Sequence, residues 1–312
     1  MFLKFKGALL IFSLTMCTLV SCVEDEKNPF ENTDGSETGE VFDVKLPGMG
    51  DFYVGTEIEL RGNGFTADDE IYVTSVDDSS ASAQARVTSY TADKLFFTMP
   101  SGVVIYGGNV EVSLVRKGEW HTLGTLYVNN FGFNNMGFDS TGGEYIEING
   151  EYADGDKAYY QDMNDYGQLL GQPVEIDLEL QNYGDAYSDI VITSVFYPLT
   201  NQYMFVYEHN GETAIEQQMG NVNPIWPNQY SANVGDTVFV EWRGFKAGDK
   251  VLISQGGGIE NAVATIDNPI IEEGGLTFEV PNIGEMYYEI LLQRYEGHAT
   301  IIGNLYVYNN NN

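Results

Sequence analysis

The two ends of this 312-residue chain repeat each other, and this repetition constrains the fold more than any other feature. Residues 54–71 lie without a gap over residues 234–251. A degenerate middle copy begins near residue 145 and closes near residue 222. The end copies match again further along, at residues 95–100 and 276–281, at Arg116 and Arg294, and at residues 124–128 and 303–307. Since copies of one unit fold alike, the sequence predicts three modules of about ninety residues each.

Each copy alternates apolar and polar residues with the period of a β-strand. Glu59 separates Ile58 from Leu60, and the same alternation recurs at residues 110–114 and 276–280. Clusters of Gly, Asn and Asp stand between these segments, and no convincing amphipathic helix follows residue 43. Alternation of this kind predicts short, half-buried strands joined by turns, which is typical of an antiparallel sandwich.

Glycine and proline residues at fixed positions of the repeat predict where its turns lie. A glycine precedes an aromatic residue in Gly64-Phe65 and Gly244-Phe245, where we expect a bulge or a positive φ, with the aromatic ring closing the end of the sandwich. A proline is expected to end an apolar strand in each copy, and a glycine to lie at the tip of each final hairpin. These residues are Pro100, Pro198 and Pro281, and Gly118, Gly211 and Gly297.

This order of features resembles IPT/TIG-type immunoglobulin-like domains, which are common in bacterial surface proteins. The resemblance covers nearly all of residues 43–312 and is weaker in the middle copy. It implies an all-β chain of three tandem immunoglobulin-like β-sandwich domains. They span residues 43–130, a divergent 131–223, and 224–312, and are called modules 1, 2 and 3 below.

The N-terminus has the pattern of an exported lipoprotein. Lys4 and Lys6 precede an apolar stretch at residues 8–20, which is too short for a membrane span, and Leu19-Val20-Ser21-Cys22 follows. This tetrapeptide resembles a lipobox, which implies a signal peptide at residues 1–21 and a lipid, including palmitate, on Cys22. The alternative is a secreted protein whose cysteine lies there by coincidence.

Residues 22–42 are polar and predict a disordered, flexible tether. The acidic run Glu24-Asp25-Glu26 is similar to the export signal of surface-exposed lipoproteins in Bacteroidetes-type bacteria. That similarity implies an outer-membrane, lipid-anchored protein that faces the cell exterior. A plain solvated charge run is the alternative.

Charge excludes two classes of ligand. Removal of Lys4 and Lys6 with the signal leaves 12 of the 14 basic side chains against 46 acidic ones, so the formal charge moves from -32 to -34. Nucleic acid and anionic lipid surfaces repel such a chain, whereas neutral or cationic ligands suit it. Cys17 leaves with the signal and Cys22 carries lipid, so the modules are expected to hold no disulfide.

The sequence offers no catalytic constellation. The three histidines, His121, His209 and His298, fall at equivalent hairpins that do not converge, which predicts polar hairpin tips rather than a metal site. The carboxylate pairs Asp68-Asp69 and Asp154-Asp156 lie at repeat-equivalent turns, where a structural role explains them. No nucleophile elbow, phosphate loop, zinc signature or EF-hand loop occurs. We therefore expect no enzyme and no cofactor; calcium held by turn aspartates is the open alternative.

Aromatic residues are the candidates for binding. Exposed rings can pack on the C–H faces of sugars while polar side chains bind the hydroxyls. The candidate ligand-binding residues are Trp120, Trp226, Tyr230 and Trp242. The alternatives are that Trp226 packs between modules 2 and 3 and that Trp242 fills a core. The insertion at residues 159–171 could be a binding loop or a solvated hairpin.

The layout is similar to that of accessory glycan-binding proteins of SusC/SusD-type uptake systems. It implies a non-catalytic surface lipoprotein that binds polysaccharide, anchored in the membrane by lipid and associated with a SusC/SusD-like transport complex. The alternative is an adhesion or structural protein that binds another protein and has no sugar site. Exposure of Trp226, Trp242, Tyr287 and Tyr288 would discriminate between the two.

Overall fold

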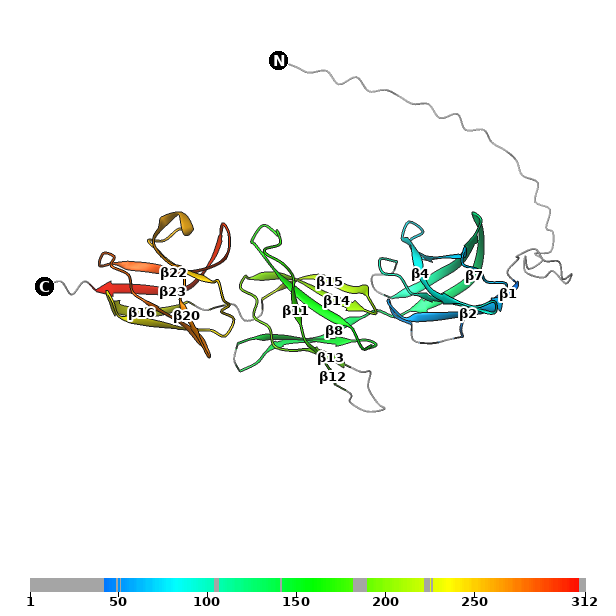
Figure 1. Ribbon diagram of the computed structural model, residues 1–312, viewed down its shortest axis with the longest axis horizontal. Coiled ribbons are helices and arrows are strands. Elements are labelled where there is room, and N and C mark those ends of the chain that lie inside the picture. The colour runs from blue at the N-terminus through cyan, green and yellow to red at the C-terminus, as the bar shows by residue number, and fades with distance from the viewer. Residues whose placement is uncertain are drawn as a thin grey trace, which may run out of the picture.

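The computed structural model describes residues 42–48, 50, 52–103, 107–140, 142–181, 190–221, 225 and 227–308. The predicted signal, Cys22 and most of the tether lie outside these residues, and so does Trp226. Within them the chain is all-β, with one 3-10 turn, η1 (Ile259–Asn261), and the predicted fold class is confirmed. None of the described helices could cross a membrane. Three bodies follow one another in a row, with module 3 at the end far from module 1 (Figure 1).

Module 1 is built from a single sheet that folds over its own core. The strand order is β1-β2-β5-β4-β3-β6-β7. The strands are β1 (Phe42–Lys45), β2 (Glu57–Asn63), β3 (Glu70–Ser75), β4 (Ser82–Tyr90), β5 (Lys94–Thr98), β6 (Gly108–Arg116) and β7 (Glu119–Val128). Ile58 and Leu60 point into the core as their alternation predicts, and Phe65 closes it.

Module 2 packs two four-stranded sheets face to face, ordered β11-β10-β14-β15 and β12-β13-β9-β8. The strands are β8 (Gly132–Phe138), β9 (Glu144–Asn149), β10 (Lys157–Met163), β11 (Val174–Ile176), β12 (Leu178–Gln181), β13 (Ile190–Thr193), β14 (Gln202–His209) and β15 (Glu212–Gly220). Its core is the most aromatic of the three, with Tyr203, Phe205 and Tyr207 fully buried on β14.

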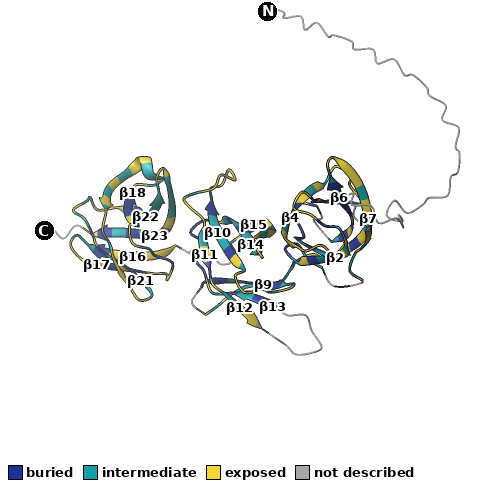
Figure 2. Ribbon diagram, turned by 45° about the vertical axis from the view of Figure 1, so that its right-hand side comes forward, coloured by how far each residue is buried: buried dark blue, intermediate teal, exposed yellow. Residues whose placement is uncertain are grey.

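Module 3 pairs a five-stranded sheet, β16-β23-β22-β18-β19, with a three-stranded one, β17-β21-β20. The strands are β16 (Asn228–Asn233), β17 (Thr237–Glu241), β18 (Lys250–Ser254), β19 (Ala262–Ile266), β20 (Ile270–Glu272), β21 (Gly275–Glu279), β22 (Tyr287–Tyr295) and β23 (His298–Tyr308). β16 runs parallel to β23, whereas the other strand pairs of this module are antiparallel. Figure 2 shows that buried residues gather inside each body.

The glycine of the Gly-aromatic pair acts differently in the two end copies. Gly64 has a φ of 83°, as predicted. Gly244 does not have a positive φ, so that expectation was wrong for module 3. A Cβ on Gly244 would instead lie 2.3 Å from Cζ2 of Trp242 and 2.6 Å from Cβ of Tyr197. Close approach of the Trp242 ring and of Tyr197 from module 2, rather than backbone conformation, therefore requires glycine there.

A buried ion pair fastens the repeated turn to the last hairpin in both end modules. Nη2 of Arg116 lies 2.6 Å from Oδ2 of Asp69, and Nη2 of Arg294 lies 2.8 Å from Oδ2 of Asp249. Each arginine also donates to the carbonyl of the glycine in its Gly-aromatic pair, Gly64 or Gly244. The structural role predicted for Asp68-Asp69 is thus confirmed at Asp69.

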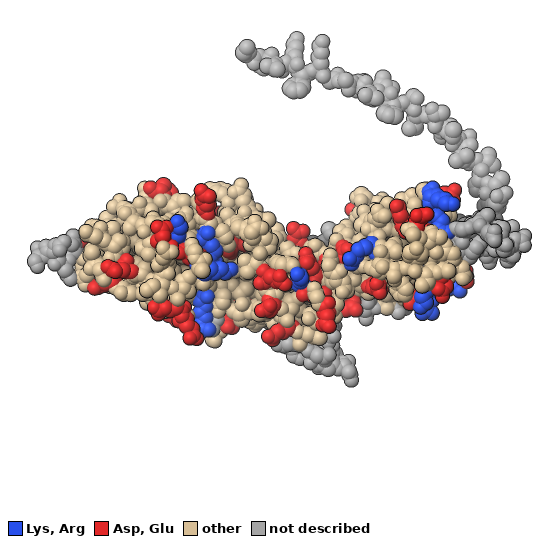
Figure 3. Space-filling model, in the orientation of Figure 1, with Lys and Arg blue, Asp and Glu red and all other residues tan. Residues whose placement is uncertain are grey.

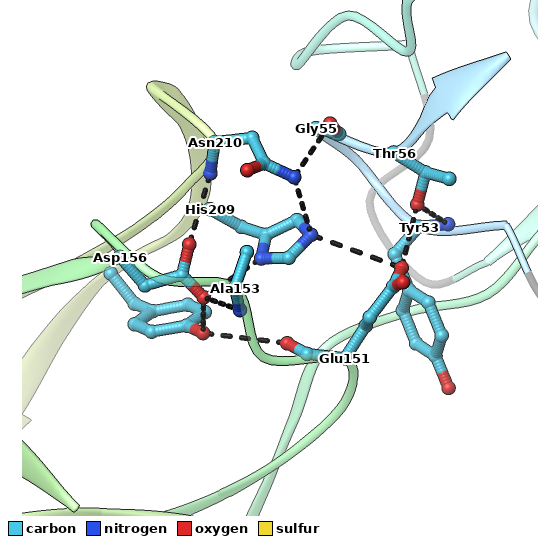
Figure 4. A network of polar contacts seen from close by, with 9 residues as sticks. Tyr53, Gly55, Thr56, Glu151, Ala153, Asp156, His209 and Asn210 are labelled. Carbon is cyan, nitrogen blue, oxygen red and sulfur yellow. Dashed lines mark hydrogen bonds and ion pairs between the residues drawn. The ribbon is translucent and has the colours of Figure 1, made fainter. Parts of the chain in front are cut away.

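Module 2 replaces this arginine with His209. Nδ1 of His209 lies 2.8 Å from Oδ2 of Asp156, the aspartate of the same turn. His209 is completely buried, because its hairpin tip inserts against the Gly55 turn of module 1 (Figure 4). The sequence predicts a polar hairpin tip at His209, and the structure adds that this one is buried at the junction with module 1. The sequence concealed this because burial comes from the neighbouring module.

Direct contacts join module 1 to module 2. Nδ2 of Asn210 donates to the Gly55 carbonyl over 3.1 Å, and Oγ1 of Thr56 donates to Oε2 of Glu151 over 3.0 Å. The ring of Tyr53 packs on Phe131, with ring centroids 4.9 Å apart. Tyr53 thereby joins the core of module 2, and the junction combines polar with aromatic contacts.

The junction between modules 2 and 3 follows the same principle. The hydroxyl of Tyr295, near the tip of the last hairpin of module 3, donates to Oδ2 of Asp162 over 2.7 Å. Nζ of Lys246 donates to the Tyr160 hydroxyl over 3.1 Å. Leu199 of module 2 belongs to the hydrophobic core of module 3. Each later hairpin tip therefore docks on the module before it.

Candidate functional site

A groove of about 440 Å³ lies on module 3, on the outer face of its five-stranded sheet. Three strands and the segment after β18 supply its walls. The lining residues are Gln229, Tyr230 and Ser231 from β16, Gln255 and Gly256 after β18, Tyr287, Tyr288 and Glu289 from β22, and Asn304 from β23. A groove of this volume is large enough for a small ligand or part of a polymer.

Strand register explains why polar groups converge there. Tyr288 and Ile290 point into the core, so Tyr287 and Glu289 point outward from β22. Residues directly opposite each other on paired strands share a face. Two outward rows follow from the register: Ser231, Tyr306 and Tyr287, and then Gln229, Asn304 and Glu289.

Three tyrosines continue this face toward the C-terminal end of β23. The ring centroids of Tyr287 and Tyr306 are 4.5 Å apart, and those of Tyr306 and Tyr308 are 4.7 Å apart. Tyr287 is 72% exposed and Tyr308 is 46% exposed. The Tyr306 hydroxyl donates to Oε1 of Glu285 over 3.1 Å, and this bond raises the pKa of Tyr306. We call Tyr287, Tyr306 and Tyr308 the tyrosine ladder.

The charge near the groove is negative. Glu289 is its one charged lining residue, and Glu285 lies beside the tyrosine ladder. The basic residues of residues 224–312 are Arg243, Lys246, Lys250 and Arg294. These lie toward module 2, and in Figure 3 the far end of module 3 shows acidic but no basic atoms on the face drawn. Acidic ligands would therefore meet repulsion at the groove.

The arrangement suits a hydroxyl-rich, uncharged ligand. The tyrosine ladder offers exposed rings on which C–H faces can pack, and Gln229, Asn304 and Glu289 offer donors and acceptors beside it. Among the described residues, no group of three or more His, Cys, Asp or Glu could hold a metal ion.

Tyr230 is the one predicted site residue that lines this groove. Its ring packs against the core of module 3, where burial raises the pKa of its hydroxyl. A Cβ on Gly303 would lie 2.8 Å from Cε2 of Tyr230, so this ring occupies the space that a larger residue would need. Tyr230 pairs with Leu305, which is fully buried, so its ring points into the core and is not an exposed platform on the groove's face.

Trp242 lies at the junction of modules 2 and 3. Its ring packs edge-on against Phe245 and Tyr197, with centroids 5.0 Å and 6.3 Å away, and the guanidinium of Arg294 lies 5.8 Å from the ring centroid. The ring is partly buried and contacts the core of module 3. We assign Trp242 to structural packing, the alternative that its sequence position left open.

Trp120 and the insertion at residues 159–171 lie apart from the groove, and Trp226 lies outside the described residues. Trp120 is 58% exposed on β7 of module 1. Residues 159–171 form part of β10 and a turn in which Tyr166 is 90% exposed. The base of this turn touches module 3, because a Cβ on Gly171 would lie 2.4 Å from Cε1 of Tyr295. We assign the insertion to a solvated hairpin with a role in the junction.

Sequence reasoning missed most of the groove. It named Tyr287 and Tyr288 as residues to test, but it overlooked Gln229, Glu289, Asn304 and the rest of the tyrosine ladder. A signal existed in the repeat. Tyr127 pairs with Asn109 in module 1, whereas its counterpart Tyr306 pairs with Tyr287 in module 3. Module 3 therefore carries an extra ring at an outward position where module 1 has an amide.

Comparison with known proteins locates one family match. Residues 42–133 match the model of the IPT/TIG domain. A search of curated proteins finds no match. One similar solved structure is SGBP-B of the mixed-linkage glucan utilization locus of Bacteroides ovatus, in complex with a mixed-linkage heptasaccharide. It is 10% identical over 86% of this chain and 71% of that chain, with a TM-score of 0.23.

A second similar structure is the I9-I11 tandem of titin. It is 12% identical over 86% of this chain and all of that chain, with a TM-score of 0.22. Both TM-scores are too low for either structure to inform the function of this chain. Residues 42–133 are thus similar to IPT/TIG domains, within a described chain whose modules are all-β and immunoglobulin-like.

Proposed function

We propose that this protein is a non-catalytic surface protein that binds a neutral polysaccharide through the groove and tyrosine ladder of module 3. The observation that carries the proposal is the exposed row of rings beside the amides of Gln229 and Asn304, at the end of the chain farthest from module 1. Modules 1 and 2 then act as spacers, since their junctions are packed and hydrogen-bonded.

We further propose that Cys22 carries the lipid that anchors the protein in the outer membrane, facing outward. The lipobox-like tetrapeptide and the acidic run after it support this proposal. A SusC/SusD-like transport complex is the partner that this placement favours. If the protein is anchored at Cys22, the last module lies farthest from the membrane, and a binding face there would meet polysaccharide outside the cell.

The experiment is affinity electrophoresis of the full-length chain in gels that contain neutral polysaccharides: amylopectin, xyloglucan, galactomannan or mixed-linkage β-glucan. We expect at least one of them to retard the protein. Polygalacturonate and chondroitin sulfate are expected not to, because Glu285 and Glu289 repel acidic chains. If the protein migrates identically in every gel, the adhesion alternative replaces the proposal.

A further inference from the structure

A second groove, of about 520 Å³, lies at the outer end of module 1 and is not explained by the proposed site. Asp68, Glu70, Val115 and Lys117 line it, together with Ala67 and Gly118. It contains the tip of the last hairpin and the repeated turn, the two elements that are fastened by the Asp69–Arg116 pair. This end of module 1 faces away from module 2.

A pair of aromatic rings, of which Trp120 is exposed and Tyr72 is half-buried, shares a sheet face with residues of this groove. Glu70 pairs with Val115 on β6, and Val115 pairs with Trp120 on β7, so these three side chains share the outer face of the sheet. Tyr72 lies on the same face, two residues beyond Glu70. Its ring centroid is 4.7 Å from that of Trp120, with the planes inclined by 45°. The indole nevertheless remains 58% exposed.

The repeat explains why this groove is open. In modules 2 and 3 the last hairpin docks on the preceding module, through Asn210 on Gly55 and through Tyr295 on Asp162. Module 1 is the first of the three, and among the described residues its last hairpin docks on neither of the other two modules. Its place in the row therefore leaves a polar groove and an indole ring at the surface.

We propose that this groove is a second saccharide-binding site, so that the protein holds one polysaccharide chain at two separate places. The inference rests on the proposed glycan-binding function. Rings beside carboxylates and the Lys117 ammonium match the chemistry of the module 3 groove, with stacking surface and hydroxyl partners together. A stable protein partner would need about 800 Å² of complementary surface, far more apolar area than these two rings offer.

Two sites on one rod strengthen binding to a long polymer more than to a short one, because the second contact becomes intramolecular. Short oligosaccharides should occupy the two sites independently. The probes are maltohexaose, cellohexaose, xylohexaose and mannohexaose, titrated calorimetrically into the full-length chain. We expect a hexasaccharide that binds to do so with a stoichiometry of about two per chain.

The variants are Trp120→Ala, Glu70→Gln and Tyr287→Ala. Trp120 is exposed and Glu70 lies on the surface, so thermal melting should show that all three variants fold. We expect Trp120→Ala and Tyr287→Ala each to lower the stoichiometry to about one, and Trp120→Ala to weaken binding of the whole polysaccharide by roughly 10-fold or more. Saccharide should also change the fluorescence of the wild type more than that of Trp120→Phe.

The outcomes separate the two proposals. A stoichiometry of one that Tyr287→Ala abolishes, with no effect of Trp120→Ala or Glu70→Gln, would overturn the second site and leave the proposed function standing. Absence of binding to every hexasaccharide and every neutral polysaccharide would overturn both. If Trp120→Ala abolishes all binding and Tyr287→Ala has no effect, the site is at module 1 and the module 3 assignment is wrong.

Discussion

At the scale of single residues, each module pairs the aspartate of its repeated turn with a side chain of its last hairpin, but the residue type of that side chain differs between modules. Arg116 and Arg294 hold their aspartates with nearly the same geometry, whereas His209 does so in module 2 with a shorter side chain. The Tyr207 hydroxyl supplies an additional bond to Oδ2 of Asp156 over 2.7 Å. The smaller imidazole is what fits where module 1 covers the hairpin tip.

We expect Arg294→Met to destabilise module 3 by about 3–5 kcal/mol, because it leaves the buried carboxylate of Asp249 without its ion-pair partner. Urea unfolding followed by tryptophan fluorescence measures the loss. Lys250→Met is the matched control: its partner Asp267 is exposed, so removal of that pair should cost less than about 1 kcal/mol. Equal losses in the two variants would contradict the role given to the buried pair.

Acid should weaken module 2 through Asp156. Burial raises the pKa of this carboxyl, but hydrogen bonds from His209, Tyr207 and two backbone N–H groups outweigh burial, so the pKa lies below its usual 3.8. A lowered pKa stabilises the fold above the unfolded value and ceases to do so as pH falls through the folded value.

The variant Asp156→Asn tests this dependence. We expect it to melt below the wild type at pH 7, with the difference between the two shrinking once the pH falls below about 3.8. Melting curves between pH 7 and pH 3 give the comparison. A difference that stays constant over this range would mean that Asp156 does not act through its charge.

At the scale of elements, the turn after Tyr53 connects sequence to assembly. Gly55 has a φ of 87°, and a Cβ there would lie 2.3 Å from the His209 carbonyl oxygen. Its counterpart Gly235 has a φ of 85°, but a Cβ there would meet only Oε1 of Glu279 at 4.0 Å. The same turn therefore supports a junction in module 1, whereas in module 3 no described residue of another module comes within 4 Å of that Cβ.

These two glycines provide a matched experiment. Both Gly55→Ala and Gly235→Ala should cost about 1 kcal/mol or more in backbone strain. Only Gly55→Ala should also separate modules 1 and 2, because the new methyl group displaces the His209 hairpin. Small-angle X-ray scattering would then show a broader distribution of lengths for Gly55→Ala alone. Unchanged scattering from both variants would show that the junction does not depend on this contact.

Much of this fold could be predicted from the sequence, because alternation and turn residues are local signals. Ile58, Leu60 and Leu276 are buried as their spacing requires, and Phe65 closes its sandwich. The burial of His209 could not be predicted from the sequence, because residues of another module bury it. The groove was also missed, because it depends on which outward residues become neighbours across β16, β22 and β23.

At the scale of the whole molecule, every later module docks its last hairpin on the module before it. The two ends of the described row are consequently unlike (Figure 1). The outer end of module 1 carries its last hairpin beside Trp120, and the far end of module 3 carries the tyrosine ladder. Lys and Arg of module 3 lie toward the junction with module 2, which leaves the far end acidic and polar.

The most direct test of the account compares two tyrosines that the repeat places at the same position. Tyr306 belongs to the ladder, whereas its counterpart Tyr127, 54% exposed, faces Asn109 instead of a second ring. The measurement is the affinity of the full-length chain for whichever neutral polysaccharide retards it. We predict that Tyr306→Ala weakens binding by roughly 10-fold or more, from stacking energy lost, and that Tyr127→Ala leaves it unchanged. Equal affinities of the wild type and Tyr306→Ala would contradict the central claim.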